Sequence, residues 1–285
     1  MTGATLRGLY INLARSPERR ERCRQQLADH GLDHCYQRLD AVDGQAARVD
    51  HPGTPFTPGK LGCWLSHLAA LKAASEHPGH THILEDDFQL TARFPAFIAA
   101  LDQHTAEVGH WDILFTDIDL AGMFNVATMK ALVARVNALS AAGRLALDDA
   151  KPLYAAGNSS YIVNGASAPR VYQLMREGLA SNLPNDLWLR KLIREEKLRA
   201  LVTLPFITTV NASFSDSTIL GNIGNSNPSI LFATLFRRSL AADADTGALL
   251  ATFKQHLGKM PPINDRGMIY AHLVAHFMSD DFKTY

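Results

Sequence analysis

Residues 81–87 read Thr-His-Ile-Leu-Glu-Asp-Asp, a short, largely apolar run followed at once by three acids. A run of this length between polar residues is typical of a strand buried in a sheet. In open α/β sheets, ligands bind outside the carboxyl ends of the strands. The stretch therefore predicts a central strand with a binding site at its end.

Similar apolar runs recur along the chain and are separated by segments with helical periodicity. Strands are expected at residues 9–13, 81–84, 111–115, 160–163 and 200–204. Helices are expected at residues 16–31, 59–77, 94–101, 126–139 and 171–175, and after Pro184. Strands that alternate with helices favour an α/β fold with a mostly parallel central sheet and helices on both of its faces. From about residue 222 a turn-rich segment leads into helical patterns, which predict a helical C-terminal extension.

The composition narrows the class of protein. The chain has 285 residues, and Lys plus Arg equal Asp plus Glu at 28 each, which argues against a dedicated nucleic-acid binder. The cysteines, Cys23, Cys35 and Cys63, have no metal-knuckle spacing and are too few for a disulfide framework. No apolar run is long enough to span a membrane. We therefore expect a soluble protein in a reducing compartment, the cytoplasm, with peripheral membrane contact left open.

Three adjacent acids at the end of a buried strand need a positive partner. A divalent cation such as Mn²⁺ or Mg²⁺ takes hard oxygen ligands of this kind. Alternate residues of an extended chain point the same way, so Glu85 and Asp87 are expected to hold the metal while Asp86 points aside. The simpler alternative is a solvated turn after an edge strand.

A second acidic pair, Asp117 and Asp119, closes the strand expected at residues 111–115. We expect this strand and the strand at 81–84 to be neighbours, so that the two acidic ends form one carboxylate-lined rim. A helix cap or a solvated loop would explain either pair alone. Asp148 and Asp149 are expected in a loop.

Four motifs occur in order within the first 90 residues: Ile-Asn-Leu-Ala-Arg-Ser-Pro-Glu-Arg-Arg at 11–20, Ala-Val-Asp-Gly at 41–44, Gly-Lys-Leu-Gly-Cys-Trp-Leu-Ser-His at 59–67 and Ile-Leu-Glu-Asp-Asp at 83–87. Looser matches follow at residues 157–163, 184–186 and 215–219. Together they resemble glycosyltransferase family 25, the family of lipooligosaccharide β-galactosyltransferases and the collagen galactosyltransferase. The resemblance implies a GT-A-like nucleotide-sugar-binding catalytic domain over residues 1–220, with 221–285 as the helical extension. It also implies a UDP-sugar donor, typically UDP-galactose, a divalent metal and inversion at the anomeric carbon.

The resemblance places a set of side chains on the donor side. Arg15 would meet the pyrophosphate through charge-assisted hydrogen bonds, and of the neighbours Arg19 and Arg20 one is expected to face inward. An Asx turn is the alternative role for Asp43, and a buried core histidine is the alternative for His67. The expected donor-side residues are Asn12, Arg15, Asp43, Lys60, Gly62, Ser66, His67, Asp86, Asn158 and Ser159.

Inversion needs one general base within reach of the acceptor hydroxyl. Asp186, at an expected helix start after Pro184, is the candidate, and a helix cap is its alternative role. Asp117 and Asp119 are held in reserve. His272 and His276 are four residues apart on an expected C-terminal helix, which is a metal-ligand spacing, but surface or core positions are favoured for both.

These expectations describe a metal-dependent, inverting hexosyltransferase. It would move a sugar, galactose by family precedent, from a UDP-sugar to a hydroxyl of a glycan or a lipid-linked lipooligosaccharide acceptor, at the cytosolic face of the membrane and in lipopolysaccharide biosynthesis. One alternative is a nucleotide-sugar hydrolase that uses water as acceptor. Another is a non-catalytic nucleotide- or glycan-binding family member, because Asn158, Ser159 and Asn185 depart from the family pattern, although the intact acids at 85–87 argue against it.

Overall fold

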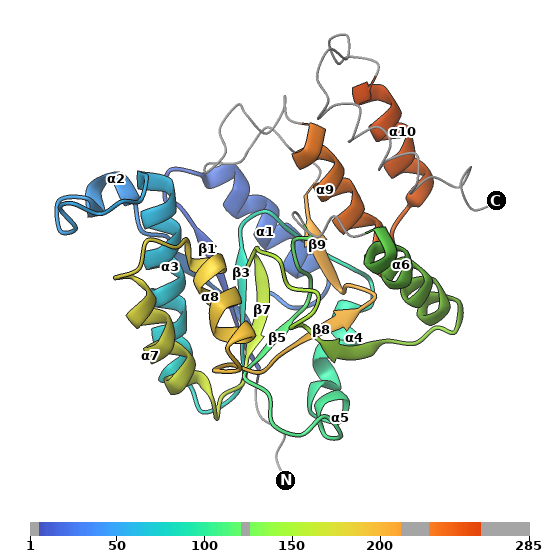
Figure 1. The fold of residues 1–285 in the computed structure, drawn as a ribbon, viewed down its shortest axis with the longest axis horizontal. Coiled ribbons are helices and arrows are strands. Elements are labelled where there is room, and N and C mark those ends of the chain that lie inside the picture. Colours follow the sequence, from blue (N-terminus) through green and yellow to red (C-terminus); the bar gives the residue numbers. More distant parts are fainter. Residues whose placement is uncertain (1–5, 121–125, 212–227, 258–285) are drawn as a thin grey trace.

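The computed structural model describes residues 6–120, 126–211 and 228–257 (Figure 1). The looser family match at 215–219, the turn-rich segment at 222–227 and the histidines His272 and His276 lie outside these ranges. Among the described residues, no helix has both the length and the apolar character that crossing a bilayer requires.

Strands and helices alternate through most of the chain, as the periodicity predicts. The strands are β1 (Arg7–Asn12), β2 (Tyr36–Asp40), β3 (Thr81–Glu85), β4 (Phe88–Leu90), β5 (Ile113–Phe115), β6 (Ala146–Asp149), β7 (Ser160–Val163), β8 (Ala200–Leu204) and β9 (Thr208–Val210). The helices are α1 (Pro17–Asp29), α2 (Gly44–Ala47), α3 (Pro58–Ser75), α4 (Phe94–Ala99), α5 (Leu101–Thr105), α6 (Val126–Ala141), α7 (Ala168–Gly178), α8 (Asn185–Arg194), α9 (Pro228–Ser239) and α10 (Thr246–Leu257).

In the described part of the chain, seven strands form one sheet in the order β2-β1-β3-β7-β5-β8-β6, and β4 pairs with β9 in a small second sheet. Strands β1, β2, β3, β5 and β8 run in one direction, whereas β7 and β6 run against them. The α/β class with a mostly parallel sheet is therefore confirmed. The carboxyl ends of β1, β3 and β5 lie at one edge of the sheet, together with the start of β7.

Two details of the expected topology are wrong. β3 and β5 are not neighbours, because β7 lies between them and pairs antiparallel with both. Asp148 and Asp149 are not in a loop but in β6, which pairs antiparallel with β8. The Asp148 carboxylate is held there by Arg135, which donates Nε and Nη2 hydrogen bonds of 2.6 Å to it, so an edge strand tolerates the acid.

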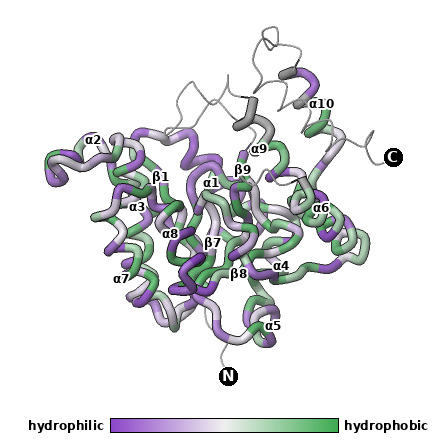
Figure 2. Tube along the Cα trace, viewed as in Figure 1, coloured by the Kyte–Doolittle hydropathy of each residue, from purple (hydrophilic) through white to green (hydrophobic). Residues whose placement is uncertain are grey.

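The sheet is buried on both faces, because successive side chains of its strands point to opposite sides. On β1, Leu9 and Ile11 belong to the hydrophobic core beneath α3, α6, α7 and α8, whereas Tyr10 belongs to a second core beneath α1 and α4. Hydrophobic residues run through the central strands in Figure 2, and hydrophilic ones gather at the tip of the loop beside α2. Such burial explains why the central strands read as continuous apolar runs.

Helix α9 from the expected C-terminal extension packs directly on the sheet domain. Phe236 and Leu240 join the larger core, and the Phe206 amide donates a 2.9 Å hydrogen bond to the Leu240 carbonyl. The expected boundary near residue 220 falls outside the described ranges and stays a prediction.

Candidate functional site

A cavity of about 300 Å³ opens at the carboxyl edge of the sheet, beside the ends of β1 and β3. Its other walls come from the loop that leads into α2 and from the first turns of α3. Cys63 and Arg19 line it, and Arg20 is exposed, so Arg19 is the inward-facing member of that pair. The expected site residues that line the cavity are Arg15, Asp43, Gly62, Ser66, His67, Glu85, Asp86 and Asp87.

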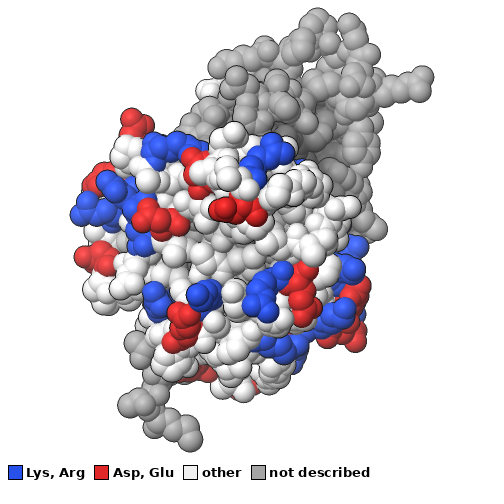
Figure 3. Space-filling view, turned by 90° about the vertical axis from the view of Figure 1, so that its left-hand side faces the viewer, with Lys and Arg blue, Asp and Glu red and all other residues white. Residues whose placement is uncertain are grey.

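The outer surface beside α2, α3 and α7 carries charges of both signs (Figure 3). Lys and Arg side chains are interspersed there with Asp and Glu, so the described part of this face presents no large patch of one sign. A basic stripe that would suit a nucleic-acid backbone is therefore missing from this described face.

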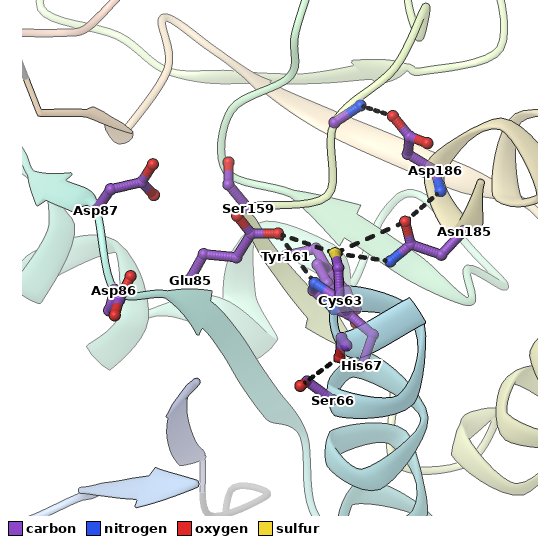
Figure 4. A network of polar contacts seen from close by, with 12 residues as sticks. Cys63, Ser66, His67, Glu85, Asp86, Asp87, Ser159, Tyr161, Asn185 and Asp186 are labelled. Atoms are coloured by element: carbon purple, nitrogen blue, oxygen red, sulfur yellow. Dashed lines mark hydrogen bonds and ion pairs between the residues drawn. The ribbon is translucent and has the colours of Figure 1, made fainter. Parts of the chain in front are cut away.

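Glu85, the last residue of β3, points toward helix α3 (Figure 4). His67 Nε2 lies 3.0 Å from Glu85 Oε1, and Cys63 Sγ lies 3.9 Å from the same oxygen. Burial alone would raise the pKa of Glu85, but the hydrogen bond from His67 and the nearby charges of His67 and Arg237 lower it below its ordinary value. Glu85 is therefore an ionised carboxylate, which accepts the Nε2 proton of His67.

Asp86 is held by the first strand and the first helix. Its carboxylate accepts hydrogen bonds of 2.7 Å from Asn12 Nδ2, and Arg19 Nη2 lies 2.7 Å from its other oxygen. Asn12 also donates to the Ser16 carbonyl and accepts from Arg38 Nε at 3.0 Å. Asn12 is thus buried behind the cavity wall, where it orients Asp86.

Asp87 is the third of the adjacent acids and also lines the cavity. Its Oδ1 atom is buried and has no hydrogen-bond partner, and Arg19 Nη2 lies 3.9 Å from Oδ2. Burial and the negative charge of Glu85 raise the pKa of Asp87 to about 6. Two carboxylates on one cavity, one of them with an unpartnered oxygen, are a donor set that fits a hard divalent cation.

The loop at residues 41–44 forms the wall opposite the acids and depends on two small side chains of α3. A Cβ atom added to Gly62 would lie 2.7 Å from the Val42 carbonyl oxygen, so only glycine allows this contact. Ser66 Oγ accepts a 2.8 Å hydrogen bond from the Val42 amide and donates to the Gly62 carbonyl at 2.6 Å. Asp43 caps α2 through the Gln45 amide and forms an ion pair with Arg15. The Val42 carbonyl group therefore occupies the space that a side chain at residue 62 would need.

Besides Asn12, three expected donor-side residues lie away from the cavity lining. Lys60 is exposed in the first turn of α3. Asn158 and Ser159 are buried just before β7, where the Ser159 carbonyl accepts a 2.8 Å hydrogen bond from the Glu85 amide. They support the end of β3 from the side of β7.

Arg237 is a residue that sequence reasoning missed. It comes from α9, is buried, and donates a 2.7 Å hydrogen bond from Nε to Asp117 at the end of β5. It also donates a hydrogen bond to Ser159 Oγ. A buried aspartate requires a nearby cation, but the partner lies 120 residues away in the chain, and no local pattern points to it.

Asp186 lies in the first turn of α8 and is partly exposed. Its carboxylate accepts hydrogen bonds from the Leu187 amide at 2.8 Å and the Gly157 amide at 3.2 Å. Beside it, Asn185 Oδ1 accepts from the Asp186 amide at 2.9 Å, and Asn185 Nδ2 lies 3.5 Å from Cys63 Sγ. One polar network therefore runs from Glu85 through Cys63 and Asn185 to Asp186 (Figure 4).

The family described as "Glycosyltransferase family 25 (LPS biosynthesis protein)" matches residues 7–177, more than half of the chain. The chain belongs to glycosyltransferase family 25. The family match contains β1, α3 and β3 with all the cavity acids, and it ends before Asp186 and Arg237.

Two curated relatives match a smaller region. A "Glycosyltransferase 25 family member" of Aedes aegypti is 30% identical over 122 residues. A "Procollagen galactosyltransferase 1-A" of Xenopus laevis is 29% identical over 124 residues. Each alignment covers 37% of this chain and 20% of the relative, so the chain matches about a fifth of the length of these proteins.

Proposed function

We propose that this family 25 chain is an inverting hexosyltransferase that moves galactose from UDP-galactose to a hydroxyl of a glycan. The observation that carries the proposal is the polar network between the cavity acids and Asp186. A transferase needs its general base near the donor site, because the acceptor hydroxyl must reach the base and the anomeric carbon together. The network supports this by joining Cys63, in the cavity lining, to Asn185 and the backbone amide of Asp186.

The donor diphosphate would bind between the acids and the start of α3. Arg15 and Arg19 line the cavity and offer guanidinium groups for charge-assisted hydrogen bonds to phosphate oxygens. Gly59, in the first turn of α3, also lines the cavity, so the partial positive charge of the helix N-terminus lies at the same place. The cavity volume of about 300 Å³ suits a small-molecule ligand.

Glu85 and Asp87 would hold Mn²⁺ or Mg²⁺. The bound cation would offset the charge that develops on UDP as the leaving group. Arg19 supports this arrangement by holding Asp86 at 2.7 Å and by lying 3.9 Å from Asp87, which keeps the acidic turn in place before a ligand binds.

Asp186 would accept the proton of the acceptor hydroxyl during attack on the anomeric carbon. The Gly157 and Leu187 amides fix the position of its carboxylate, and its partial exposure leaves room for an acceptor. Attack from this side, opposite the departing UDP, would invert the anomeric centre.

The acceptor is proposed to be a glycan, and a lipid-linked glycan of lipopolysaccharide type in particular. The family description names LPS biosynthesis, and one relative is named a procollagen galactosyltransferase. Both names point to a large molecule as the acceptor. Work at the inner membrane face in the cytoplasm is part of this proposal.

Product analysis tests the proposal. The protein is incubated with UDP-galactose, Mn²⁺ and a panel of glycan acceptors, and new glycosides are separated from free galactose. We expect a β-galactoside, and we expect Asp186→Asn to lower transfer by about 10²–10⁴-fold while UDP affinity stays within about twofold. Free galactose without any glycoside would indicate a hydrolase, and near-normal transfer by Asp186→Asn would remove that residue from the role of base.

A further inference from the structure

Three metal-ligating side chains of different chemistry meet on one wall of the cavity. Cys63 and His67 are four residues apart in α3 and therefore lie on the same face of the helix, one turn apart. Glu85 reaches the same point from the end of β3 (Figure 4). Cys63 Sγ, one ring nitrogen of His67 and one carboxylate oxygen of Glu85 all lie within 4.8 Å of one another.

The separations of these atoms are close to those of a tetrahedral zinc site. Zinc–sulfur bonds of about 2.3 Å and zinc–nitrogen or zinc–oxygen bonds of about 2.0 Å require a sulfur–oxygen distance of about 3.5 Å and a nitrogen–oxygen distance of about 3.3 Å. Here Cys63 Sγ lies 3.9 Å from Glu85 Oε1, and His67 Nε2 lies 3.0 Å from that oxygen. These two distances differ from the required values by a few tenths of an ångström, and the sulfur and the ring nitrogen lie within 4.8 Å of each other.

The second ring nitrogen of His67 also has a partner, to which it can donate its proton when a metal ion replaces the proton on Nε2. His67 Nδ1 lies 3.0 Å from the Tyr161 hydroxyl, and the two rings stack with centroids 5.8 Å apart. A partner on Nδ1 fixes the ring orientation and leaves Nε2 facing the other two donors. All three donor residues line the cavity, which gives an ion a path from solvent.

We propose that Cys63, His67 and Glu85 form a binding site for a thiophilic divalent cation of the Zn²⁺ class, distinct from the oxygen-only pair Glu85 and Asp87. Three protein ligands leave a fourth position for water or for an atom of a bound ligand. A thiolate and an imidazole select zinc and cobalt over magnesium and manganese. The site is argued from the three side chains alone and does not require the proposed transfer activity.

Because Glu85 belongs to both donor sets, the two cations should compete. An ion held by Cys63 and His67 would draw Glu85 away from Asp87. If the proposed function is also correct, low concentrations of Zn²⁺ should weaken the Mn²⁺-dependent binding of UDP and slow transfer. This consequence, unlike the site itself, rests on the proposed function.

Cobalt spectroscopy tests the site directly. Co²⁺ is titrated into the metal-free 285-residue chain, and the near-ultraviolet sulfur-to-cobalt charge-transfer band and the visible bands of tetrahedral Co²⁺ are recorded. We expect both in the wild type, and we expect Zn²⁺ to abolish them. Cys63→Ser should abolish the charge-transfer band, whereas Cys35→Ser, at a half-buried thiol on the loop before β2, should keep it.

Two further variants keep the test informative if Cys63→Ser fails to fold. Tyr161→Phe removes only the hydroxyl that holds His67 and should keep the band while weakening Co²⁺ affinity by about 10–100-fold. Glu107→Gln, at an exposed acid outside the cavity lining, should keep the band with unchanged Co²⁺ affinity.

The absence of a charge-transfer band in the wild type, or a band that survives Cys63→Ser in a folded protein, would overturn the proposal. Wild-type protein that shows no band but binds UDP in Mn²⁺ would overturn this site and leave the proposed function standing. A charge-transfer band in a protein that binds no UDP would support this site and contradict the proposed function.

Discussion

The acidic ends of β3 and β5 lie at the same edge of the sheet, but their charges are balanced in different ways. At the end of β5, Asp117 is sealed under α9 and paired with the buried guanidinium of Arg237. At the end of β3, Glu85 and Asp87 line an open cavity, and Arg19 Nη2 lies 3.9 Å from Asp87. Each aspartate keeps one buried oxygen without a hydrogen-bond partner, Asp117 Oδ1 and Asp87 Oδ1. The difference is one of access, because the acid at the end of β5 is closed off by α9, whereas the acids at the end of β3 face a cavity that an ion can enter.

The largest effect on stability is expected at the β5 end. Arg237→Met should lower the free energy of unfolding by about 3–5 kcal/mol, because Asp117 would be left as a buried charge without its cation. Denaturant unfolding measures this, with Arg238→Met, at the half-buried neighbouring position, as the matched control. Combining Arg237→Met with Asp117→Asn should recover part of the loss. Equal small losses of stability for Arg237→Met and Arg238→Met would mean that the ion pair of Asp117 and Arg237 contributes little to the stability of the fold.

A smaller effect is expected from the cavity wall beside β3. Gly62→Ala should cost about 1–3 kcal/mol, because the added methyl group would overlap the Val42 carbonyl and displace the loop at 41–44. Gly165→Ala offers a control, since its Cβ would lie 2.5 Å from the Gly79 carbonyl oxygen, away from the cavity lining. Both variants should lose stability, but only Gly62→Ala should lose UDP affinity, as calorimetry would reveal. A similar UDP affinity for the two variants would show that the loop at 41–44 is not part of the donor site.

The smallest effect is a pH dependence of the metal-free protein. The pKa of Asp87 is about 6 in the folded chain against an ordinary value of 3.8, so ionisation of Asp87 disfavours the folded state. The favourable contribution of its protonated form is complete below about pH 4 and is lost as the pH rises through about 6. The melting temperature of the wild type, relative to Asp87→Asn, should therefore fall over this interval in the presence of a chelator. If the melting temperatures of the two proteins change with pH in the same way, the negative charge of Asp87 is already neutralised by the protein itself.

The fold was predictable where burial imposes a pattern on the sequence. The central strands β1, β3, β5 and β8 are buried on both faces and read as continuous apolar runs, so their existence and the α/β class followed directly. The direction of β7 did not, because Ser160–Val163 has the same pattern whichever way it runs. β6 was taken for a loop because two adjacent acids are unusual in a strand, and the partner that stabilises Asp148 there, Arg135, is distant in the sequence.

The site was predictable where its residues are close in the sequence. The acids at 85–87 and the pair Ser66 and His67 could be found from local motifs, and the helical spacing of Cys63 and His67 was a signal that we did not use. Asn12, expected at the nucleotide, lies outside the cavity lining and donates a hydrogen bond to Asp86. Arg237 could not be placed, because nothing in a helix sequence tells which distant carboxylate it will meet.

Calorimetric titration of UDP into the wild type and Asp87→Asn, each with and without Mn²⁺, tests the central claim most directly. The claim is that the acidic end of β3 is a cation site that serves a nucleotide donor. The wild type should bind UDP in Mn²⁺ and bind it at least about tenfold more weakly without the metal, whereas Asp87→Asn should bind weakly in both conditions. Equal UDP affinity with and without Mn²⁺ in the wild type, or no loss in Asp87→Asn, would contradict the claim.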